Sequence, residues 1–349
     1  MVAVSVGIRP FDQDLAPRWQ TYVDAHADGT LFHGLAWKRA VERAFGHRSR
    51  YLAAERGGHV VGVLPLFEVR SILAGRLFVS VPYATYGGVL ADDEPAAALL
   101  LDHARQLAHE SSARSIELRS VRAAVRDADV RHSHVTFRRS LPPRPEDVAD
   151  WMPRKARAAA RRAAERYALT VEYGPSLLPV VWKLYSRSMR RLGSPNYPYR
   201  FFEELLAAMG EAGVVQLVRY QQTPVAGLLT FLYRETVMPY FAGQDERAPV
   251  YGLNNFLYAE SMRWGIQHGY RFYDFGRTRI DNTGSYDFKR FCGFEPQPLE
   301  YQTLVLPGRT AADLSAGSPR WSTARRVWQS LPLPITRPLG AWLAKSIPG

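Results

Sequence analysis

The most constraining feature of this 349-residue sequence is one order of apolar segments that occurs twice. The order is a tight turn, two strands, a glycine-containing turn, a helix and a short strand. The first copy has its turn at Gly57 and Gly58, strands at 60–67 and 77–82, the Tyr86-Gly87-Gly88 turn, a helix at 94–110 and a strand at 115–119. The second has its turn at 221–224, strands at 225–231 and 237–242, Gly243, a helix at 253–268 and a strand at 272–276. This repetition predicts two mixed α/β domains of one fold.

An acidic residue occupies the same place in the last strand of each copy: Glu117 in the first and Asp274 in the second. Two unrelated α/β domains would explain the order of elements less well and the matched acids not at all. We therefore expect a first domain at 1–150, a connecting helix at 151–168, a second domain at 169–310 and a tail at 311–349.

Composition is that of a globular protein, with 46% hydrophobic and 12% aromatic residues. The single cysteine, Cys292, excludes an internal disulfide, fits a reducing cytosol and is expected to be a small core residue. Residues 1–10 lack the pattern of a secretory signal, and no apolar stretch approaches the roughly 18 residues that span a bilayer. No His/Cys cluster has metal-ligand spacing, so we expect a cytoplasmic protein with no metal.

The chain is strongly basic, with a net charge of +12 and a pI of about 9.9. This charge favours an anionic partner such as RNA, a phosphorylated substrate or lipid headgroups, although a high-GC gene also raises arginine content. The excess is concentrated at 154–166, a predicted helix with six cations and one acid.

On that helix, a narrow packing stripe is expected at Ala156, Ala160, Ala163, Ala164 and Tyr167. The arginines off the stripe are candidate contacts for nucleic-acid phosphates: Arg154, Arg157, Arg161 and Arg162. The alternative is a solvated helix face. The sequence has no obvious RNA-binding signature with regularly spaced aromatics, so backbone charge would supply most of the affinity for RNA.

Two short motifs near the end of the repeat combine charges with apolar residues. Residues 273–277 read as a buried strand that ends in an acid, a glycine and a cation, and residues 284–290 read as a glycine-led turn before Lys289. Charged side chains at such places are usually paired or used. The flanking Tyr286 and Phe288 suggest that Lys289 has a half-buried stem and a directed ammonium.

These motifs resemble the FemAB-type aminoacyl and peptidyl transferases, a branch of the GNAT acyltransferases. The resemblance covers nearly the whole chain. It rests on the following residues of this sequence: Phe32-His33, Trp37, Phe45-Gly46, 60–67, 82–88, Glu117-Leu118-Arg119, Gly227, 240–243, Asn254-Asn255, Tyr258, 274–277, 284–289 and 293–296. The tail at 328–334 is similar to that of the subgroup associated with exosortase/PEP-CTERM loci, which also encode exopolysaccharide machinery.

The resemblance implies two tandem GNAT-like domains with mixed sheets flanked by helices. It also implies transfer of an aminoacyl group from a charged tRNA to an amine, in which an amine attacks an ester carbonyl. The lysine of the family's Phe-Lys motif matches Lys289, which is implied to stabilise the oxyanion. The coiled-coil arms of some members are absent, as is the acetyl-CoA signature Arg/Gln-x-x-Gly-x-Gly/Ala of ordinary GNAT enzymes. The acceptor implied by the subgroup is an envelope or exopolysaccharide precursor.

Several residues are candidates for catalytic or binding roles, and for most of them a purely structural role is the alternative. Asp274 would orient the amine or accept its proton, or it would pair with Arg277 or Arg279. Arg277 suits an anionic substrate because its planar fork binds phosphate. The remaining candidates for substrate contact are Tyr286, Tyr240, Asn254, Asn255, Tyr86 and His33. For Tyr240 and Tyr286 core packing is an equal interpretation, and for Asn254 and Asn255 the alternative is capping of the following helix. Tyr86 and His33 would help to form an acceptor site, and the alternative for His33 is a structural hydrogen bond.

The tail from Leu314 to Gly349 has no acidic residue and carries Arg320, Arg325, Arg326, Arg337 and Lys345 among Trp321, Trp328 and Trp342. Such a segment either rests on an anionic membrane surface or packs back on the protein through its tryptophans. Prolines at 332, 334 and 338 break a long amphipathic helix, which favours packing.

Three functions follow from these observations. The leading hypothesis is aminoacyl transfer from charged tRNA to an amine, with no bound cofactor and the tRNA as co-substrate. The first alternative is an N-acyltransferase that uses an acyl-CoA or another acyl thioester, which a basic notch beside a splayed strand pair would favour. The second alternative is a non-catalytic, membrane-associated scaffold.

Overall fold

The computed structural model describes residues 5–122, 124, 130–309 and 322–348. Contacts divide the chain into two compact units: Met1–His134 with Pro298–Ser315 and Trp342–Gly349, and Val135–Gln297 with Ala316–Ala341. The predicted mixed α/β class is confirmed. The division lies near residue 134 and not near 150, because β10 (Arg138–Ser140) pairs with β15 (Phe272–Asp274). The chain also returns to the first unit, since β17 (Gln297–Val305) pairs with β8 (Ser115–Leu118).

The first unit contains two sheets. One has the order β1-β3-β4-β7, from Val6–Pro10, Leu52–Arg56, His59–Leu64 and Leu90–Ala91. The other sheet has seven strands and includes, in order, β17-β8-β6-β5-β2, in which β6 is Gly75–Val79, β5 is Phe67–Ser71 and β2 is Arg48–Ser49. The helices are α1 (Ala16–Ala25), η1 (Leu31–His33), α2 (Leu35–Phe45) and α3 (Glu94–Glu110). The predicted single strand at 60–67 is divided between β4 and β5 at Pro65, which has no N–H for a ladder.

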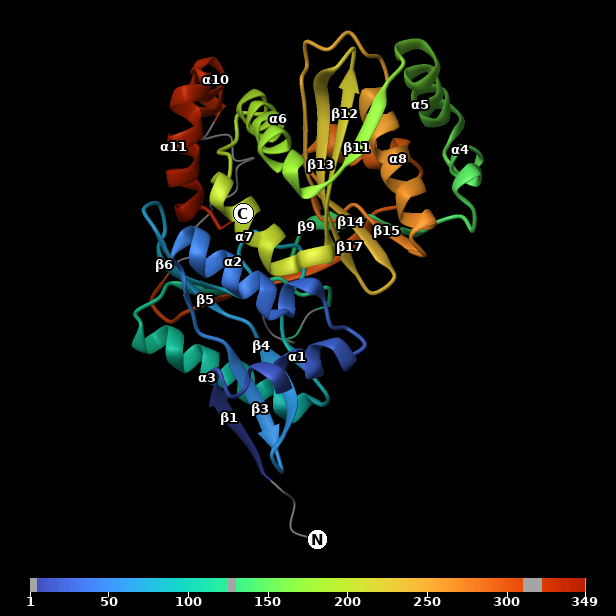
Figure 1. Cartoon of the computed structure of the whole chain (residues 1–349). Helices are drawn as coiled ribbons and strands as arrows, with labels where there is room; N and C mark the ends of the chain where they lie inside the picture. The colour runs from blue at the N-terminus through green and yellow to red at the C-terminus, as the bar shows by residue number, and fades with distance from the viewer. Residues whose placement is uncertain (1–4, 123, 125–129, 310–321, 349) are drawn as a thin grey trace. The chain divides into compact units, whose positions relative to one another are not determined.

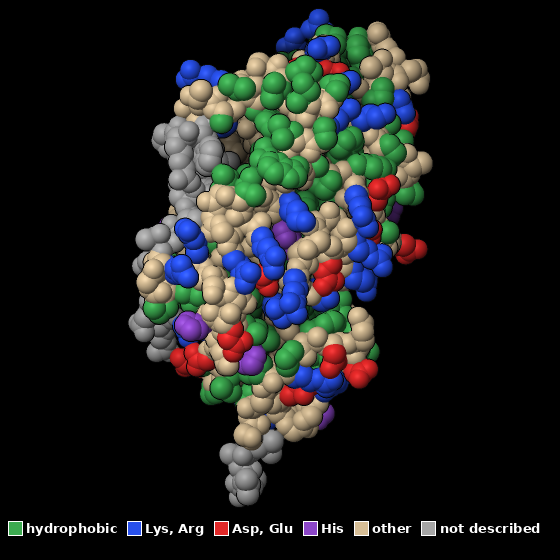
Figure 2. Space-filling model, turned by 90° about the vertical axis from the view of Figure 1, so that its left-hand side faces the viewer, with side chains coloured by type: hydrophobic (Ala, Val, Ile, Leu, Met, Phe, Trp, Pro, Cys, Tyr) green, Lys and Arg blue, Asp and Glu red, His purple; other side chains and the backbone are tan. Residues whose placement is uncertain are grey.

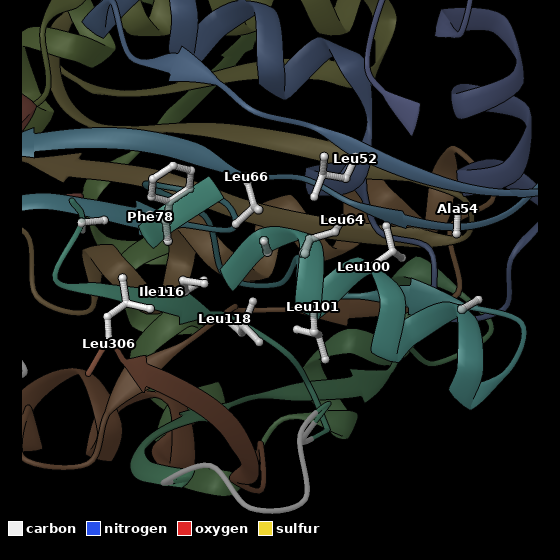
Figure 3. Close-up of a cluster of buried hydrophobic side chains, with 14 of the residues drawn as sticks. Leu52, Ala54, Leu64, Leu66, Phe78, Leu100, Leu101, Ile116, Leu118 and Leu306 are labelled. Carbon is white, nitrogen blue, oxygen red and sulfur yellow. The ribbon is translucent and has the colours of Figure 1, made fainter. Parts of the chain in front are cut away.

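The core of the first unit lies where α3 packs against strands of both sheets. Leu100 and Leu101 of α3 lie among Leu52 and Leu64 of one sheet and Phe78 of the other, all fully or nearly fully buried (Figure 3). The carboxylate of Asp93 accepts a hydrogen bond from the Ala96 N–H at 3.0 Å. This N-cap fixes the start of α3 at the predicted residue.

The second unit is one six-stranded sheet covered on both faces (Figure 1). Its order is β10-β15-β14-β13-β12-β11, with β14 at Thr236–Gln244, β13 at Thr223–Tyr233, β12 at Gly213–Tyr220 and β11 at Thr170–Tyr173. The helix α6 (Leu178–Arg191) packs on one face and α8 (Leu253–Gln267) on the other, with α5 (Arg154–Tyr167) outside α8. The remaining elements of this unit are η2 (Pro145–Asp147), α4 (Val148–Trp151), η3 (Pro175–Leu177), α7 (Tyr199–Met209), η4 (Gly210–Ala212), β16 (Thr278–Arg279) and α9 (Thr283–Phe291), and β9 (Val130–Thr136) begins in the first unit and ends in the second.

The predicted repeat is visible in the sheets. In the first unit, β6 and β8 pair in parallel at only two positions, Phe78 with Ile116 and Val79 with Glu117. In the second unit, β14 and β15 do the same, Thr236 with Phe272 and Val237 with Tyr273. In both units, therefore, the strand after the helix of the copy forms a short parallel pair with a strand that precedes that helix.

The described part of the tail forms two helices, α10 (Ser322–Ser330) and α11 (Leu333–Ser346). Pro332 lies between them, whereas Pro338 lies inside α11. The prolines thus divide the tail without preventing helix formation. Arg320 and Trp321 lie outside the described residues.

Candidate functional site

The parallel pair of the second unit opens after two residues. Among the described residues, β14 and β15 pair only at Thr236–Val237, yet β14 continues to Gln244 while β15 ends at Asp274. A bulge lies in the freed part of β14, since Leu229 pairs with Phe241 and Thr230 with Pro239. Tyr240 is therefore the extra residue of the bulge, and bulges of this kind commonly redirect a side chain beside a site. The splay between these two strands is the candidate site.

A tightly bonded loop lies at the end of β15. Asp274 is 4% exposed, and its Oδ1 accepts hydrogen bonds from the Gly276 N–H at 2.8 Å and the Thr136 hydroxyl at 3.2 Å. Gly276 has a φ of 65°, a left-handed conformation that favours glycine. Asp274 thus holds the turn that leads from the strand into Arg277.

Lys289 is bound to the same loop. Its Nζ donates to the backbone carbonyl oxygens of Phe275 at 2.9 Å, Gly276 at 3.0 Å and Arg277 at 3.3 Å. Burial lowers the pKa of Lys289 to about 7, and the nearby Asp274 carboxylate opposes that shift. An ammonium has three N–H donors, and three carbonyls accept from them here.

In this geometry Lys289 holds the loop through its ammonium, and the oxyanion contact that the family resemblance implies stays a prediction. The surrounding segment also differs from the prediction. Residues 283–291 are the helix α9 and not a turn, because the Asn282 side chain accepts a hydrogen bond from the Ser285 N–H and caps the helix. Helix geometry aims Lys289 inward at the loop, while Arg290 is exposed.

The other residues predicted near this loop have packing roles or known partners. Arg279 pairs with Asp281 at 2.6 Å. Arg277 is half-buried at the end of the loop. Tyr286 packs edge-on against Phe137 with ring centroids 5.4 Å apart, which supports its core reading.

The two asparagines do not cap α8, because Gly252 is the N-cap and the helix begins at Leu253. Asn254 is half-buried in the first turn, and Asn255 is buried with its Nδ2 at 3.9 Å from Cys292 Sγ. Burial raises the pKa of Cys292 to about 12, as expected for a core residue and not for a nucleophile.

The start of α8 is closed by α5. A Cβ built on Gly252, whose φ is +79°, would lie 2.3 Å from the Ala159 carbonyl oxygen of α5. The Arg162 guanidinium lies over the Tyr251 ring at 5.0 Å. The backbone of α5 therefore occupies the space beside the loop that enters α8.

The outer side of α5 is basic, as predicted. Arg154, Arg161 and Arg162 are exposed, whereas Arg157 is half-buried and pairs with Asp150 at 2.5 Å. A surface hollow on this helix is lined by Ala158, Arg161, Arg162, Glu165 and Arg166. The packing stripe is Ala156, Ala159, Ala160 and Ala163, so the expectation for Ala164 was wrong: it is exposed.

The two candidates in the first unit are buried. His33 Nε2 lies 3.2 Å from the Gly88 carbonyl oxygen. Because a carbonyl oxygen can only accept a hydrogen bond, Nε2 carries the proton. Nδ1 then accepts a hydrogen bond from the Thr30 hydroxyl at 2.8 Å. Burial lowers the pKa of His33 to about 3, which keeps the ring neutral. His33 is therefore a structural residue. Tyr86 is also buried, with its ring 6.1 Å from that of Phe32.

An aromatic cluster beside the splay was not predicted from the sequence. Tyr185 of α6 packs on Phe241 of β14 at 5.6 Å, and burial raises its pKa well above the usual value, with Tyr197 and Tyr240 nearby. Gly243 was predicted in a turn but lies in β14. A glycine is required there because the α6 backbone comes so close that a Cβ would be 2.1 Å from the Tyr185 nitrogen. The helical spacing of Val181, Leu184 and Tyr185 was a signal for this contact.

Comparison with known proteins agrees with this geometry. Residues 152–290 match the sequence model of the Acetyltransferase (GNAT) domain. The second unit therefore contains a segment similar to the GNAT domain. Among curated protein sequences no significant match is found.

Solved structures show that the likeness extends to both units of the fold. A structure of FemX superposes with a TM-score of 0.63 at 16% identity, over 86% of this chain and 97% of that one. A tandem GNAT protein from the clavulanic acid biosynthesis pathway gives 0.56 at 12%, over 86% and 98%. The C-terminal domain of a putative lysylphosphatidylglycerol synthetase from Agrobacterium fabrum gives 0.54 at 15%, over 83% and 91%. The fold is that of tandem GNAT proteins.

Proposed function

We propose that this protein is a FemAB-type aminoacyltransferase that moves an aminoacyl group from a charged tRNA to an amine of an envelope or exopolysaccharide-related precursor. The similarity to FemX and the PEP-CTERM-like tail support this choice. In the reaction the amine nitrogen forms a bond to the ester carbonyl carbon, the bond to the tRNA ribose oxygen breaks, and the amine proton passes to that oxygen. An amide and a free tRNA end result.

The observation that carries the proposal is the closed start of α8. Acetyl-CoA signatures place a glycine-rich loop at a helix N-terminus, where backbone N–H groups bind pyrophosphate. Here the Ala159 carbonyl of α5 lies against Gly252, and a carbonyl repels phosphate oxygens. The loop before α8 carries Asp245 and Glu246, which pair with Arg187 at 2.9 Å and Arg191 at 2.9 Å. This region is unsuited to CoA, whereas the arginines outside α5 suit the phosphates of a longer polyanion.

The splay supplies the groups that the chemistry needs. Beyond Val237 pairing with β15 has stopped, and the backbone N–H groups of β14 that do not bond to β13 are the proposed donors for an oxyanion, Pro239 excepted. Asp274 and Lys289 hold the loop that borders these groups. Tyr240 on the bulge and Arg277 after the loop are the proposed substrate contacts. The chain's own role is to orient the two reactants and to stabilise charge.

One observation favours the acyl-thioester alternative: the splayed strand pair itself, which accommodates an extended acyl carrier. A basic notch beside the strand pair would favour this alternative further, whereas the contact of Gly252 with α5 disfavours a phosphate at the start of α8. A non-catalytic scaffold would need neither the bulge at Tyr240 nor the buried loop of Asp274.

Binding of three ligand classes tests the proposal: charged tRNA, the same tRNA after deacylation, and a set of acyl-CoAs. A ligand that binds only the folded state raises the melting temperature by mass action. The proposal expects stabilisation by charged tRNA above deacylated tRNA and none by acyl-CoA. Stabilisation by an acyl-CoA alone would overturn it.

A matched pair of variants tests the role of α5. The side chain of Arg161 is 74% exposed on α5, and that of Arg70 is 78% exposed on β5. The change Arg161→Ser is expected to weaken tRNA binding and to reduce its salt dependence by about one unit of slope, as for one lost phosphate contact. Arg70→Ser is expected to leave both unchanged. Equal effects of the two variants would contradict a specific role for α5.

A further inference from the structure

The helix α11 has its large apolar side chains on the outside. Ile335 is 48% exposed, Leu339 38% and Trp342 56%, and Pro338 is exposed with them. Residues spaced by three, four and seven lie on one face of a helix, so these four form a single apolar stripe. A helix that only packs on its protein presents the opposite arrangement.

The inner face of α11 is small and polar. It consists of Thr336, Gly340, Ala344 and Ser346, all buried. A Cβ on Gly340 would lie 2.5 Å from Asn196 Oδ1, so the helix could not approach as closely with a larger residue there. Close packing is thus achieved without the apolar stripe.

The helix is also firmly held, so a loose tail does not explain the exposure. In the second unit, Arg337 Nε donates to the Ser186 hydroxyl at 3.0 Å, and Asn196 Nδ2 donates to the Arg337 carbonyl at 3.3 Å. In the first unit, the Tyr83 N–H donates to the Pro348 carbonyl at 2.7 Å, and Arg119 Nη2 donates to the same oxygen at 3.1 Å. The outward stripe is therefore a fixed feature of α11.

Charge accompanies this stripe. No acidic residue occurs from Leu314 to Gly349. Arg326 on α10 and Lys345 on α11 are exposed, and Val327 beside Arg326 is 54% exposed. Figure 2 shows hydrophobic side chains gathered on the side of the molecule where α10 and α11 lie. This combination of a tryptophan-bearing apolar face with cations only is typical of helices that lie in the interface of an anionic membrane.

We propose that α10 and the outer stripe of α11 form a docking surface for an anionic lipid bilayer. The cations would lie at the headgroup level, with the stripe below them and Trp342 at the boundary. A second copy of the chain is a poorer occupant, because a tail without acids offers the cations of another copy no partner. None of the helices in the described part of the chain is long and apolar enough to span a bilayer, so docking would be peripheral. The inference does not depend on the proposed aminoacyl transfer.

Sedimentation with lipid vesicles tests it, using the full chain and no substrate. Vesicles of phosphatidylcholine with about 30 mol% phosphatidylglycerol, which carry a negative surface potential as cytoplasmic leaflets do, are compared with phosphatidylcholine alone. The proposal expects binding to the anionic vesicles, a blue shift of tryptophan emission, and loss of binding at high salt. The triple change Ile335→Ser, Leu339→Ser and Trp342→Ser is expected to weaken binding at least about tenfold with an unchanged melting temperature.

A matched pair of single variants separates vesicle binding through the stripe from nonspecific binding through exposed leucines. Leu339 on α11 and Leu99 on α3 are each 38% exposed. Leu339→Ser is expected to weaken vesicle binding, and Leu99→Ser is expected to leave it unchanged. The proposal is overturned if the wild-type protein does not bind anionic vesicles, or if the triple variant binds them as well as the wild type does. It is also overturned if the stripe changes abolish self-association in sedimentation velocity without altering vesicle binding, since that result assigns the face to a second copy.

Discussion

The ammonium of Lys289 lies 2.9 Å from the carbonyl oxygen of Phe275, fourteen residues earlier in the chain. This contact joins the two motifs that stand out in the sequence, the strand end at 273–277 and the lysine of α9. Asp274 bonds the same loop from within, through the Gly276 N–H. The motifs are therefore one structural unit, and its purpose is to fix the backbone that follows β15 at the mouth of the splay.

Lys289→Met is expected to lower the free energy of unfolding by about 1–3 kcal/mol, because three buried carbonyls lose their donor. Activity should fall with it, since the loop beside the splay is no longer held. The measurement is urea unfolding beside kcat and KM. Arg290→Met, on the exposed neighbour in α9, is the control and should change neither. A loss of kcat with full stability would instead indicate direct contact of Lys289 with the substrate.

The stability of the protein should depend on pH through Lys289. Its pKa in the folded state, about 7, is below the ordinary value of 10.5, so between these values the unfolded chain binds more protons. The unfavourable contribution is complete below pH 7 and disappears as the pH rises toward 10.5. The difference in unfolding free energy between wild type and Lys289→Met should therefore shift in favour of wild type by up to about 1.4 kcal/mol per pH unit across this range. A difference that stays constant from pH 7 to 10 would contradict the shift.

Gly243→Ala is expected to destabilise the second unit severely. The new Cβ would lie 2.1 Å from the Tyr185 nitrogen, so strand β14 or helix α6 must move. Gly284→Ala in α9 is the matched control, because no atom lies within 4 Å of its Cβ position and alanine favours a helix. Thermal unfolding should show a large fall in melting temperature for the first variant and no fall for the second. Comparable melting temperatures would show that α6 does not press on β14.

Acid should destabilise the first unit before its carboxylates titrate. Burial lowers the pKa of His33 to about 3 and that of His47 to about 4, so each ring stays neutral in the folded state while the unfolded chain takes up protons below pH 6.5. Stability is then present above pH 6.5 and is lost as the pH falls, by up to about 1.4 kcal/mol per pH unit for each ring. His47→Gln should reduce the slope measured by urea unfolding between pH 6 and 5. His109→Gln, at the exposed end of α3, should not.

Local signals in the sequence were sufficient for much of the fold. The helix at 94–110 is α3 at both ends because Asp93 and Pro95 mark its start in the sequence itself. The turn at 221–224 is confirmed, since Gln221 and Gln222 both have positive φ in the β12–β13 hairpin. The order of elements, and hence the repeat, follows from such signals.

The predictions that failed depended on the position of a neighbour. For Lys289 the sequence indicates a half-buried stem and a directed ammonium, but it does not identify the carbonyl partners, which belong to a loop that only the folded chain brings near. A glycine at position 243 suggests a turn, but glycine is needed there because the backbone of α6 approaches strand β14 closely. Asn254 and Asn255 look like caps, yet Gly252 can adopt a φ of 79° and begins the helix before them. Side-chain direction and backbone approach are tertiary properties that spacing does not encode.

Transfer of labelled amino acids tests the central claim most directly. A mixture of tRNAs charged with labelled amino acids is incubated with the protein and an extract of envelope and exopolysaccharide precursors, beside a parallel reaction with labelled acetyl-CoA. The account predicts base-stable label in the extract from the charged tRNAs, as expected for an amide, and a strong reduction with Lys289→Met. Label from acetyl-CoA and none from charged tRNA would contradict it.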